Sequence, residues 1–167
     1  MRSMSGSWNL NGRQRMDLSI DFARHQSLCK PQQKNIVSTD QGSSCRHIAH
    51  NSDQCHVRHY RVDGDLITVG KRCDFMLLNE DRKNVYLIEL KGSDLHQAIA
   101  QVEATEKILR TNFPEYAFFY RLIYHARVHT VQDETIKRWI ERCGIVKKQD
   151  TVCRVAVVRH LCYEERI

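Results

Sequence analysis

One stretch of the sequence, residues 85–91, is apolar at almost every position and becomes polar only at its end. It reads Val-Tyr-Leu-Ile-Glu-Leu-Lys. Side chains alternate between the two faces of a strand, so Glu89 and Lys91 share one face while apolar residues occupy both. Apolar residues on both faces are typical of a strand buried in the middle of a sheet. A carboxylate and an ammonium at the end of such a strand are costly to desolvate unless they are paired.

The preceding segment predicts a partner for Glu89. Residues 73–78 have the pattern of a strand, and the polar residues 79–84 predict a turn. If the hairpin is symmetric about that turn, Asp74 lies opposite Glu89, with Cβ atoms roughly 4.5–5.5 Å apart. Two half-buried carboxylates so placed share a proton or hold a cation between them. Hard ions such as Mg²⁺ bind carboxylate oxygens together with waters and phosphate oxygens.

The remaining periodicity predicts a sheet flanked by helices. Helices are predicted over 95–110, capped by Ser93 or Asp94, and over a segment that begins at Thr130 or Asp133 and ends at Gly144. Strands are predicted over 116–124 and 152–158, and a hairpin over 60–69. Residues 16–22 alternate as in a strand, although their i, i+4 apolar pairs leave a helix open.

This order of elements predicts an α/β (α+β) fold with a central mixed β-sheet flanked by helices. One domain over 16–167 follows a flexible N-terminus, residues 1–15. Within the domain, residues 24–59 are polar and rich in Gln, Ser, His and Asn, so we expect a long loop or an insertion there.

This polar segment contains a second candidate site. Six cysteine and histidine side chains lie close together in the sequence: Cys45, His47, His50, Cys55, His56 and His59. They are enough donors for a tetrahedral Zn²⁺ site, with Cys45, His47, His50 and Cys55 as the first candidates. The spacing matches no common zinc finger, and solvated loop histidines are the simpler interpretation.

Composition and charge change this picture little. The chain has 167 residues and a net charge of +6, a mild bias toward polyanionic partners such as nucleic acid. No stretch approaches the roughly 20 apolar residues of a membrane span, and the first residues lack the apolar region of a signal peptide. Seven cysteines without a compact repeated spacing indicate reduced thiols. We therefore expect a cytoplasmic protein that is neither secreted nor bound to a membrane.

Asp74, followed by Glu89-Leu90-Lys91 at the end of the next strand, resembles the PD-(D/E)xK nuclease superfamily. Its members include restriction endonucleases, Holliday-junction resolvases and recombination exonucleases. The resemblance covers about residues 69–109. It implies a restriction endonuclease-like core in which Asp74, Glu89 and the backbone carbonyl of Leu90 bind Mg²⁺ or Mn²⁺. It also implies that Lys91 assists the nucleophilic water.

Two features depart from the family pattern. Cys73 stands where the family has Pro. The family commonly supplies a further acidic residue, usually Glu, from a first helix, but this sequence has no Glu before Glu80. Asp17 or Asp21 could take that role, or the role is vacant.

Further residues near the pair are candidates for contact with the substrate. Several branches of the family carry a Gln in the helix after the Lys, which the resemblance assigns to Gln97, with Gln101 as second choice. Gly70 is followed by two cations, Lys71 and Arg72, which suits close approach to a phosphate. An ordinary basic turn is an equally good interpretation of these three residues.

The function expected from the sequence is metal-dependent hydrolysis of phosphodiester bonds in DNA. One alternative is a catalytically inert nucleic-acid-binding or scaffold protein on the same fold. Another is a nucleic-acid-binding module stabilised by zinc at the Cys45–His59 cluster. A homodimer stays open as well, because nucleases that cut both strands often dimerise.

Overall fold

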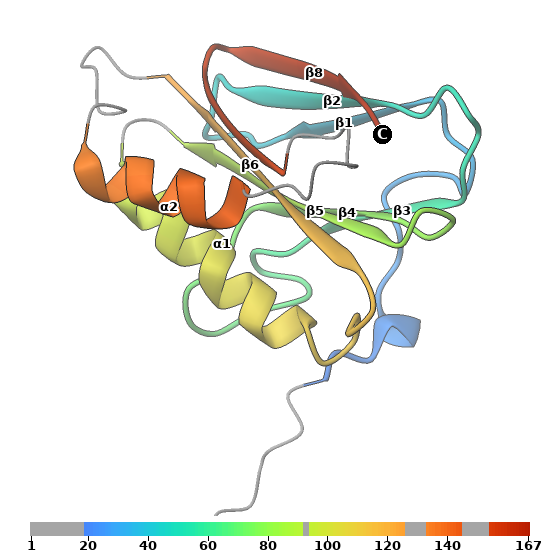
Figure 1. The fold of residues 1–167 in the computed structure, drawn as a ribbon. Coiled ribbons are helices and arrows are strands. Elements are labelled where there is room, and N and C mark those ends of the chain that lie inside the picture. Colours follow the sequence, from blue (N-terminus) through green and yellow to red (C-terminus); the bar gives the residue numbers. More distant parts are fainter. Residues whose placement is uncertain (1–18, 92–93, 126–132, 145–153) are drawn as a thin grey trace, which may run out of the picture.

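The computed structural model describes residues 19–91, 94–125, 133–144 and 154–167. These residues form three layers, which Figure 1 shows from the side: a pair of helices, a five-stranded sheet and a three-stranded sheet. The expected mixed α/β (α+β) fold, with helices packed against a sheet, is confirmed. The three-stranded sheet is an addition that the sequence pattern does not predict.

The five-stranded sheet is the central layer. Its strands and the helices between them are β3 (Val57–Arg61), β4 (Phe75–Asn79), β5 (Asn84–Lys91), α1 (Leu95–Leu109), β6 (Ala117–Tyr124), α2 (Glu134–Gly144) and β7 (Val155–Arg159). The strand order is β3-β4-β5-β6-β7. β4 is antiparallel to both β3 and β5, whereas β6 runs parallel to β5 and β7 runs parallel to β6. The sheet is therefore mixed, as the sequence predicts.

The helices cover one face of this sheet and begin where the sequence predicts. Asp94 caps α1, since its side chain accepts from the Gln97 N–H, and Asp133 accepts from the Thr135 N–H at the start of α2. Because β5 and β6 are parallel and a helix follows each, both strands end and both helices begin at the same edge of the sheet. None of the helices in the described ranges is long and apolar enough to cross a membrane.

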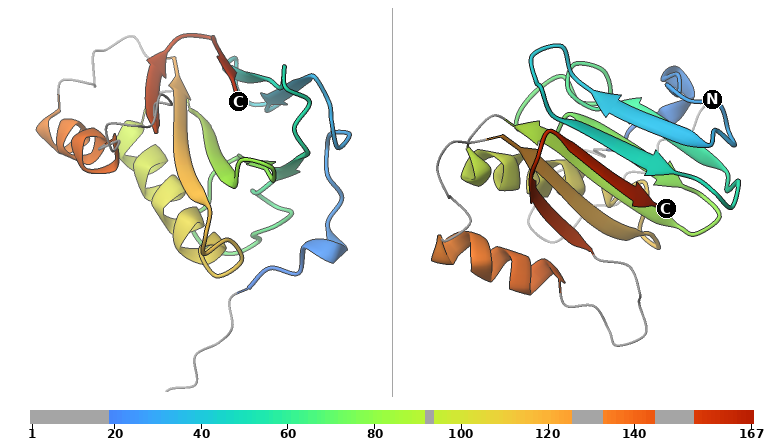
Figure 2. Two further views of the ribbon diagram at one scale, coloured as in Figure 1. Left: turned by 45° about the vertical axis from the view of Figure 1, so that its right-hand side comes forward. Right: turned by 90° about the horizontal axis from the view of Figure 1, so that it is seen from above.

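The polar segment 24–59, expected to be a long loop or an insertion, is not one continuous loop, because it contains two short strands and the start of β3. Its strands β1 (Asn35–Thr39) and β2 (Arg46–His50) pair with β8 (Cys162–Arg166) in the order β1-β2-β8. This sheet covers the face of the central sheet opposite the helices (Figure 2). The inward positions include the buried polar residues Ser38 and His47, so the apolar alternation that marks a strand is missing from the sequence.

A buried ion cluster joins the two sheets. Arg121 of β6 donates to both carboxylate oxygens of Glu165 of β8, over 2.6 and 2.7 Å, and His47 of β2 donates to the same carboxylate over 2.8 Å. Arg121 and His47 are fully buried. Burial acts to raise the pKa of Glu165, but the hydrogen bonds from His47 and Arg121 outweigh it and the pKa is lowered. The carboxylate therefore stays ionised between its two donors.

Three further predictions of secondary structure, for residues 60–69, 152–158 and 16–22, differ from the structure or lie partly outside the described residues. β3 does not form a hairpin over 60–69; it ends at Arg61 and pairs with β4, and a loop with positive φ at Gly64 and Gly70 connects the two strands. The last strand is predicted over 152–158 and observed as β7, Val155–Arg159. Residues 152 and 153 of the prediction lie outside the described residues. The described end of the 16–22 segment forms a 3-10 turn, Phe22–Arg24, while Asp17 lies outside the described residues.

Acid is expected to weaken the packing of the two sheets through His59, which shares a 3.0 Å hydrogen bond with Ser38. Burial lowers the pKa of His59 from 6.5 to about 4, and the charge of His47 adds to this effect. Because the unfolded chain binds a proton here at higher pH than the folded chain does, stability falls as the pH falls from 6.5 toward 4. The loss between pH 7 and pH 5 is expected to be about 2 kcal/mol.

Urea unfolding at both pH values measures this loss. The matched variant is His59→Gln, which keeps a polar partner for Ser38 but does not titrate. Equal losses in the wild-type protein and in the variant would show that His59 is not the source.

Candidate functional site

Asp74 and Glu89 face each other across the β4–β5 hairpin. Phe75 pairs with Ile88 and every further pair follows the predicted symmetry, so Asp74, just before β4, lies opposite Glu89. The Asp74 N–H donates to Glu89 Oε2 over 3.1 Å, and the Leu90 N–H donates to Asp74 Oδ2 over 2.7 Å. Each carboxylate thus binds the backbone of the opposite segment, which fixes the orientation of both.

The pair lies on the helix-covered face of the sheet, and its two members differ in exposure. Glu89 is 0 % exposed, and Asp74 is partly buried. The neighbouring Cys73 is fully buried, and its thiol donates to the Phe75 carbonyl. Burial raises the pKa of Cys73, and the charge of Glu89 raises it further. Cys73 is therefore a neutral core thiol, which makes it neither a nucleophile nor a thiolate ligand.

Helix α1 holds the backbone that leads into Asp74. Gln101 Nε2 donates to the Arg72 carbonyl over 2.8 Å, and Thr105 Oγ1 accepts from the Cys73 N–H over 2.8 Å. The Thr105 hydroxyl in turn donates to the Gln101 carbonyl. With the hydrogen bond from the Asp74 N–H to Glu89, the backbone is held at three successive residues, Arg72, Cys73 and Asp74. Thr105 has no signal in the sequence, since a single Thr on a helix is unremarkable until the facing segment is known.

The other residues predicted around the pair have different surroundings. Arg72 binds Asp63 over 2.5 Å and the Gly70 carbonyl over 2.6 Å, so its charge already has a partner, whereas Lys71 is exposed beside it. Gln97 is exposed on the first turn of α1. Lys91 is the last residue of β5 and its backbone pairs with Tyr124; its side chain is outside what the structure describes.

The described candidate for a further acidic ligand is engaged elsewhere. Asp21 accepts from the Ala23 N–H at the start of its own 3-10 turn, and its other oxygen pairs with Arg24. The segment before it is tied to the far end of α1, where Asn112 binds both backbone polar groups of Ile20. Asp21 therefore acts as a local cap.

The candidate zinc ligands do not converge. His47 binds Glu165 between the sheets, and His50 binds Asn35 and Glu164 at the surface. Cys45 and Cys55 are buried in the core between the sheets. In the ranges that the structure describes, no group of three His, Cys, Asp or Glu side chains could hold a metal ion.

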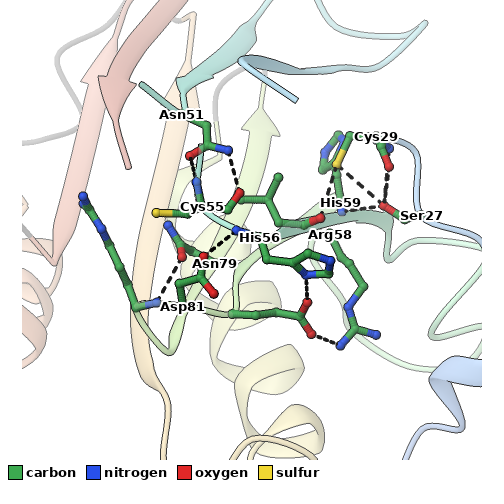
Figure 3. A network of polar contacts seen from close by, with 12 residues as sticks. Ser27, Cys29, Asn51, Cys55, His56, Arg58, His59, Asn79 and Asp81 are labelled. Atoms are coloured by element: carbon green, nitrogen blue, oxygen red, sulfur yellow. Dashed lines mark hydrogen bonds and ion pairs between the residues drawn. The ribbon is translucent and has the colours of Figure 1, made fainter. Parts of the chain in front are cut away.

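His56 and Arg58, from the polar segment 24–59, contact the turn of the β4–β5 hairpin (Figure 3). The backbone N–H of His56 donates to Asp81 Oδ2 over 2.7 Å. The imidazole of His56 binds the Glu80 carboxylate, and Arg58 donates to the same carboxylate. Asn79 Oδ1 accepts from the Arg82 N–H. The hairpin is thus held at its turn and, by the carboxylate pair, at its open end. Both sets of contacts maintain the register that brings Asp74 to Glu89.

Thr105→Val is expected to loosen the segment before Asp74, because it leaves the buried Cys73 N–H without its acceptor but keeps the branched shape. Losing one buried acceptor lowers the free energy of unfolding by about 1–3 kcal/mol. Hydrogen exchange at the Cys73 amide should accelerate in parallel. Thr105→Ser retains the hydroxyl and is the matched control; similar losses in both variants would mean that the hydroxyl does not hold this segment.

Neither a family model, nor a curated protein, nor a solved structure matches this chain. The function of the carboxylate pair is therefore inferred from its geometry and from the chemistry of the residues around it.

Proposed function

We propose that this protein is a metal-dependent nuclease that hydrolyses phosphodiester bonds in DNA through Asp74, Glu89 and Lys91. The observation that carries the proposal is the pair of reciprocal hydrogen bonds that orients both carboxylates at the end of a buried strand. The sheet supports it as well, because an antiparallel hairpin followed by a helix and a parallel strand is compatible with a restriction endonuclease-like core.

The donor set at this site fits Mg²⁺ or Mn²⁺. Asp74 and Glu89 offer carboxylate oxygens, and the N–H and C=O of a strand residue point to the same side, so the Leu90 carbonyl lies on the side of Asp74. These are hard oxygen donors, and Mg²⁺ is commonly bound by one or two carboxylates together with waters and substrate phosphates. When bound, such an ion polarises the scissile phosphate and lowers the pKa of an attacking water.

The residues of the chain have distinct roles in this proposal. Asp74 and Glu89 hold the ion, and the backbone N–H groups that they accept keep them oriented before substrate arrives. Lys91 follows Glu89 by two positions on the same strand, and we assign it to orienting the water and offsetting charge on the phosphate. Gln101 and Thr105 are positioning residues, because they act through the backbone before Asp74.

Asp74→Asn and Glu89→Gln are expected to reduce cleavage by about 100-fold or more, since both remove the charge that holds the ion. Each amide oxygen can still accept the same backbone N–H, so folding should be nearly intact. Lys91→Ala should reduce the rate similarly. Cleavage of linear, single-stranded and four-way-junction DNA, with RNA for comparison, measures the effect over a titration of Mg²⁺ or Mn²⁺.

Matched controls are available on the surface. Glu115→Gln removes an exposed carboxylate paired with Lys83, and Lys107→Ala removes an exposed ammonium from α1. Both should cleave as the wild-type protein does. Normal cleavage by Asp74→Asn or Lys91→Ala would refute the assignment.

One observation favours the alternative of an inert nucleic-acid-binding or scaffold protein: in the described ranges the site has two carboxylates and Asp21 does not add a third. Direct Mn²⁺ binding separates the two functions. If the site is catalytic, free Mn²⁺ measured by electron paramagnetic resonance should fall on adding wild-type protein, and Glu89→Gln should weaken binding by about tenfold or more. Binding that is absent, or equal in Glu89→Gln and wild type, would favour the inert protein.

A further inference from the structure

A cavity lies between the two helices. Its volume is about 400 Å³, and its lining comes from one side of each helix: His96, Ile99 and Glu103 of α1, and Thr135, Arg138, Trp139 and Arg142 of α2. A volume of this size is at the lower end of the range of small-molecule sites. The pocket is separate from the carboxylate pair, and nothing in the proposed hydrolysis uses it.

Two residues of the pocket lining nevertheless lie near the edge of the sheet that carries the carboxylates. His96 and Thr135 belong to the first turns of their helices, which begin directly beyond the ends of β5 and β6. Glu89 lies near the end of β5 at that edge. Ligands of open α/β sheets bind at the carboxyl ends of the parallel strands. Gln97, which is exposed on the first turn of α1, directly follows His96 of the pocket lining.

The lining combines an apolar floor with an excess of positive charge. Ile99 and Trp139 are mostly buried, and the Trp139 Nε1–H donates to Glu103 Oε1 over 3.0 Å. Arg142 donates to the same oxygen over 2.7 Å, so Glu103 balances one arginine. Arg138 forms no ion pair with any residue in the described ranges. Within the described ranges, the pocket therefore offers one guanidinium without an ion-pair partner, next to buried apolar and aromatic side chains.

Asp133, the acidic residue next to the start of α2, does not form an ion pair with Arg138. Asp133, which precedes α2, is paired with His96 over 3.0 Å. It also accepts from the Thr135 N–H. Its negative charge is thus directed to the helix terminus and to the imidazole rather than to Arg138.

We propose that this α1–α2 pocket binds one unpaired nucleotide of the DNA strand whose neighbouring phosphodiester lies at Asp74 and Glu89. A nucleotide has the two features that the lining matches, a phosphate for Arg138 and a flat base for the apolar floor. The proposal rests on the nuclease function and narrows its substrate. A base inside a duplex is not free to enter such a pocket without unstacking, so the substrate class is DNA with a single-stranded segment beside the cleaved bond.

Trp139 allows a direct test that does not depend on cleavage. The chain has two tryptophans, so in a Trp8→Phe variant Trp139 is the sole tryptophan and can be excited selectively over the tyrosines. Without divalent metal, a short single-stranded oligonucleotide should change this fluorescence in a saturable manner. The same sequence as a duplex should bind at least about tenfold more weakly, and an abasic strand should bind more weakly than the intact strand because it lacks the stacking base.

Arg138→Ala in the same background should weaken single-strand binding by about tenfold. Lys137→Ala removes the same charge from the adjacent position of α2, outside the pocket lining, and should have a much smaller effect. Equal effects of the two variants, equal affinity for duplex and single strand, or no change in Trp139 fluorescence would each overturn the proposal.

The outcome also separates this proposal from the nuclease function. Metal-dependent cleavage without a Trp139 response would refute the pocket and leave the nuclease assignment in place. A Trp139 response that Arg138→Ala weakens, in a protein that cleaves nothing with any metal, would support the pocket as a nucleic-acid site and refute catalysis.

Discussion

The register of the β4–β5 hairpin is the constraint on which the candidate site depends. It brings Asp74 opposite Glu89, and a shift by one residue would move every side chain of one strand to the other face of the sheet. Contacts of His56 and Asp81 hold the turn, and reciprocal backbone hydrogen bonds of the two carboxylates hold the open end. The candidate catalytic groups therefore also stabilise the arrangement that positions them.

The largely apolar interior between the two sheets also contains a buried ionic cluster. In this cluster, Arg121 and His47 make hydrogen bonds to Glu165, and both carboxylate oxygens have a donor. Removing one partner from such a cluster is costly because it leaves the others charged and buried. β8, which carries Glu165, runs parallel to β2, and Glu165 contacts both His47 of β2 and Arg121 of β6.

Helix α1 connects the two proposed parts of the substrate site. Gln101 and Thr105 lie on the side that holds the backbone before Asp74, and Ile99 and Glu103 lie on the side that lines the pocket toward α2. Its first turn lies at the sheet edge where β5 ends.

The sequence by itself determined the features that depend on neighbouring residues. Alternation in 85–91 and the polar turn before it were sufficient to pair Asp74 with Glu89, and helical spacing was sufficient for α1. Only the tertiary structure decided the second sheet, the role of Thr105 and the pocket. Ser38, His47 and Glu165 are polar at buried positions, and the partners that make their burial tolerable come from far along the chain. A local pattern shows the cost of burying such groups but cannot show which distant residue offsets it.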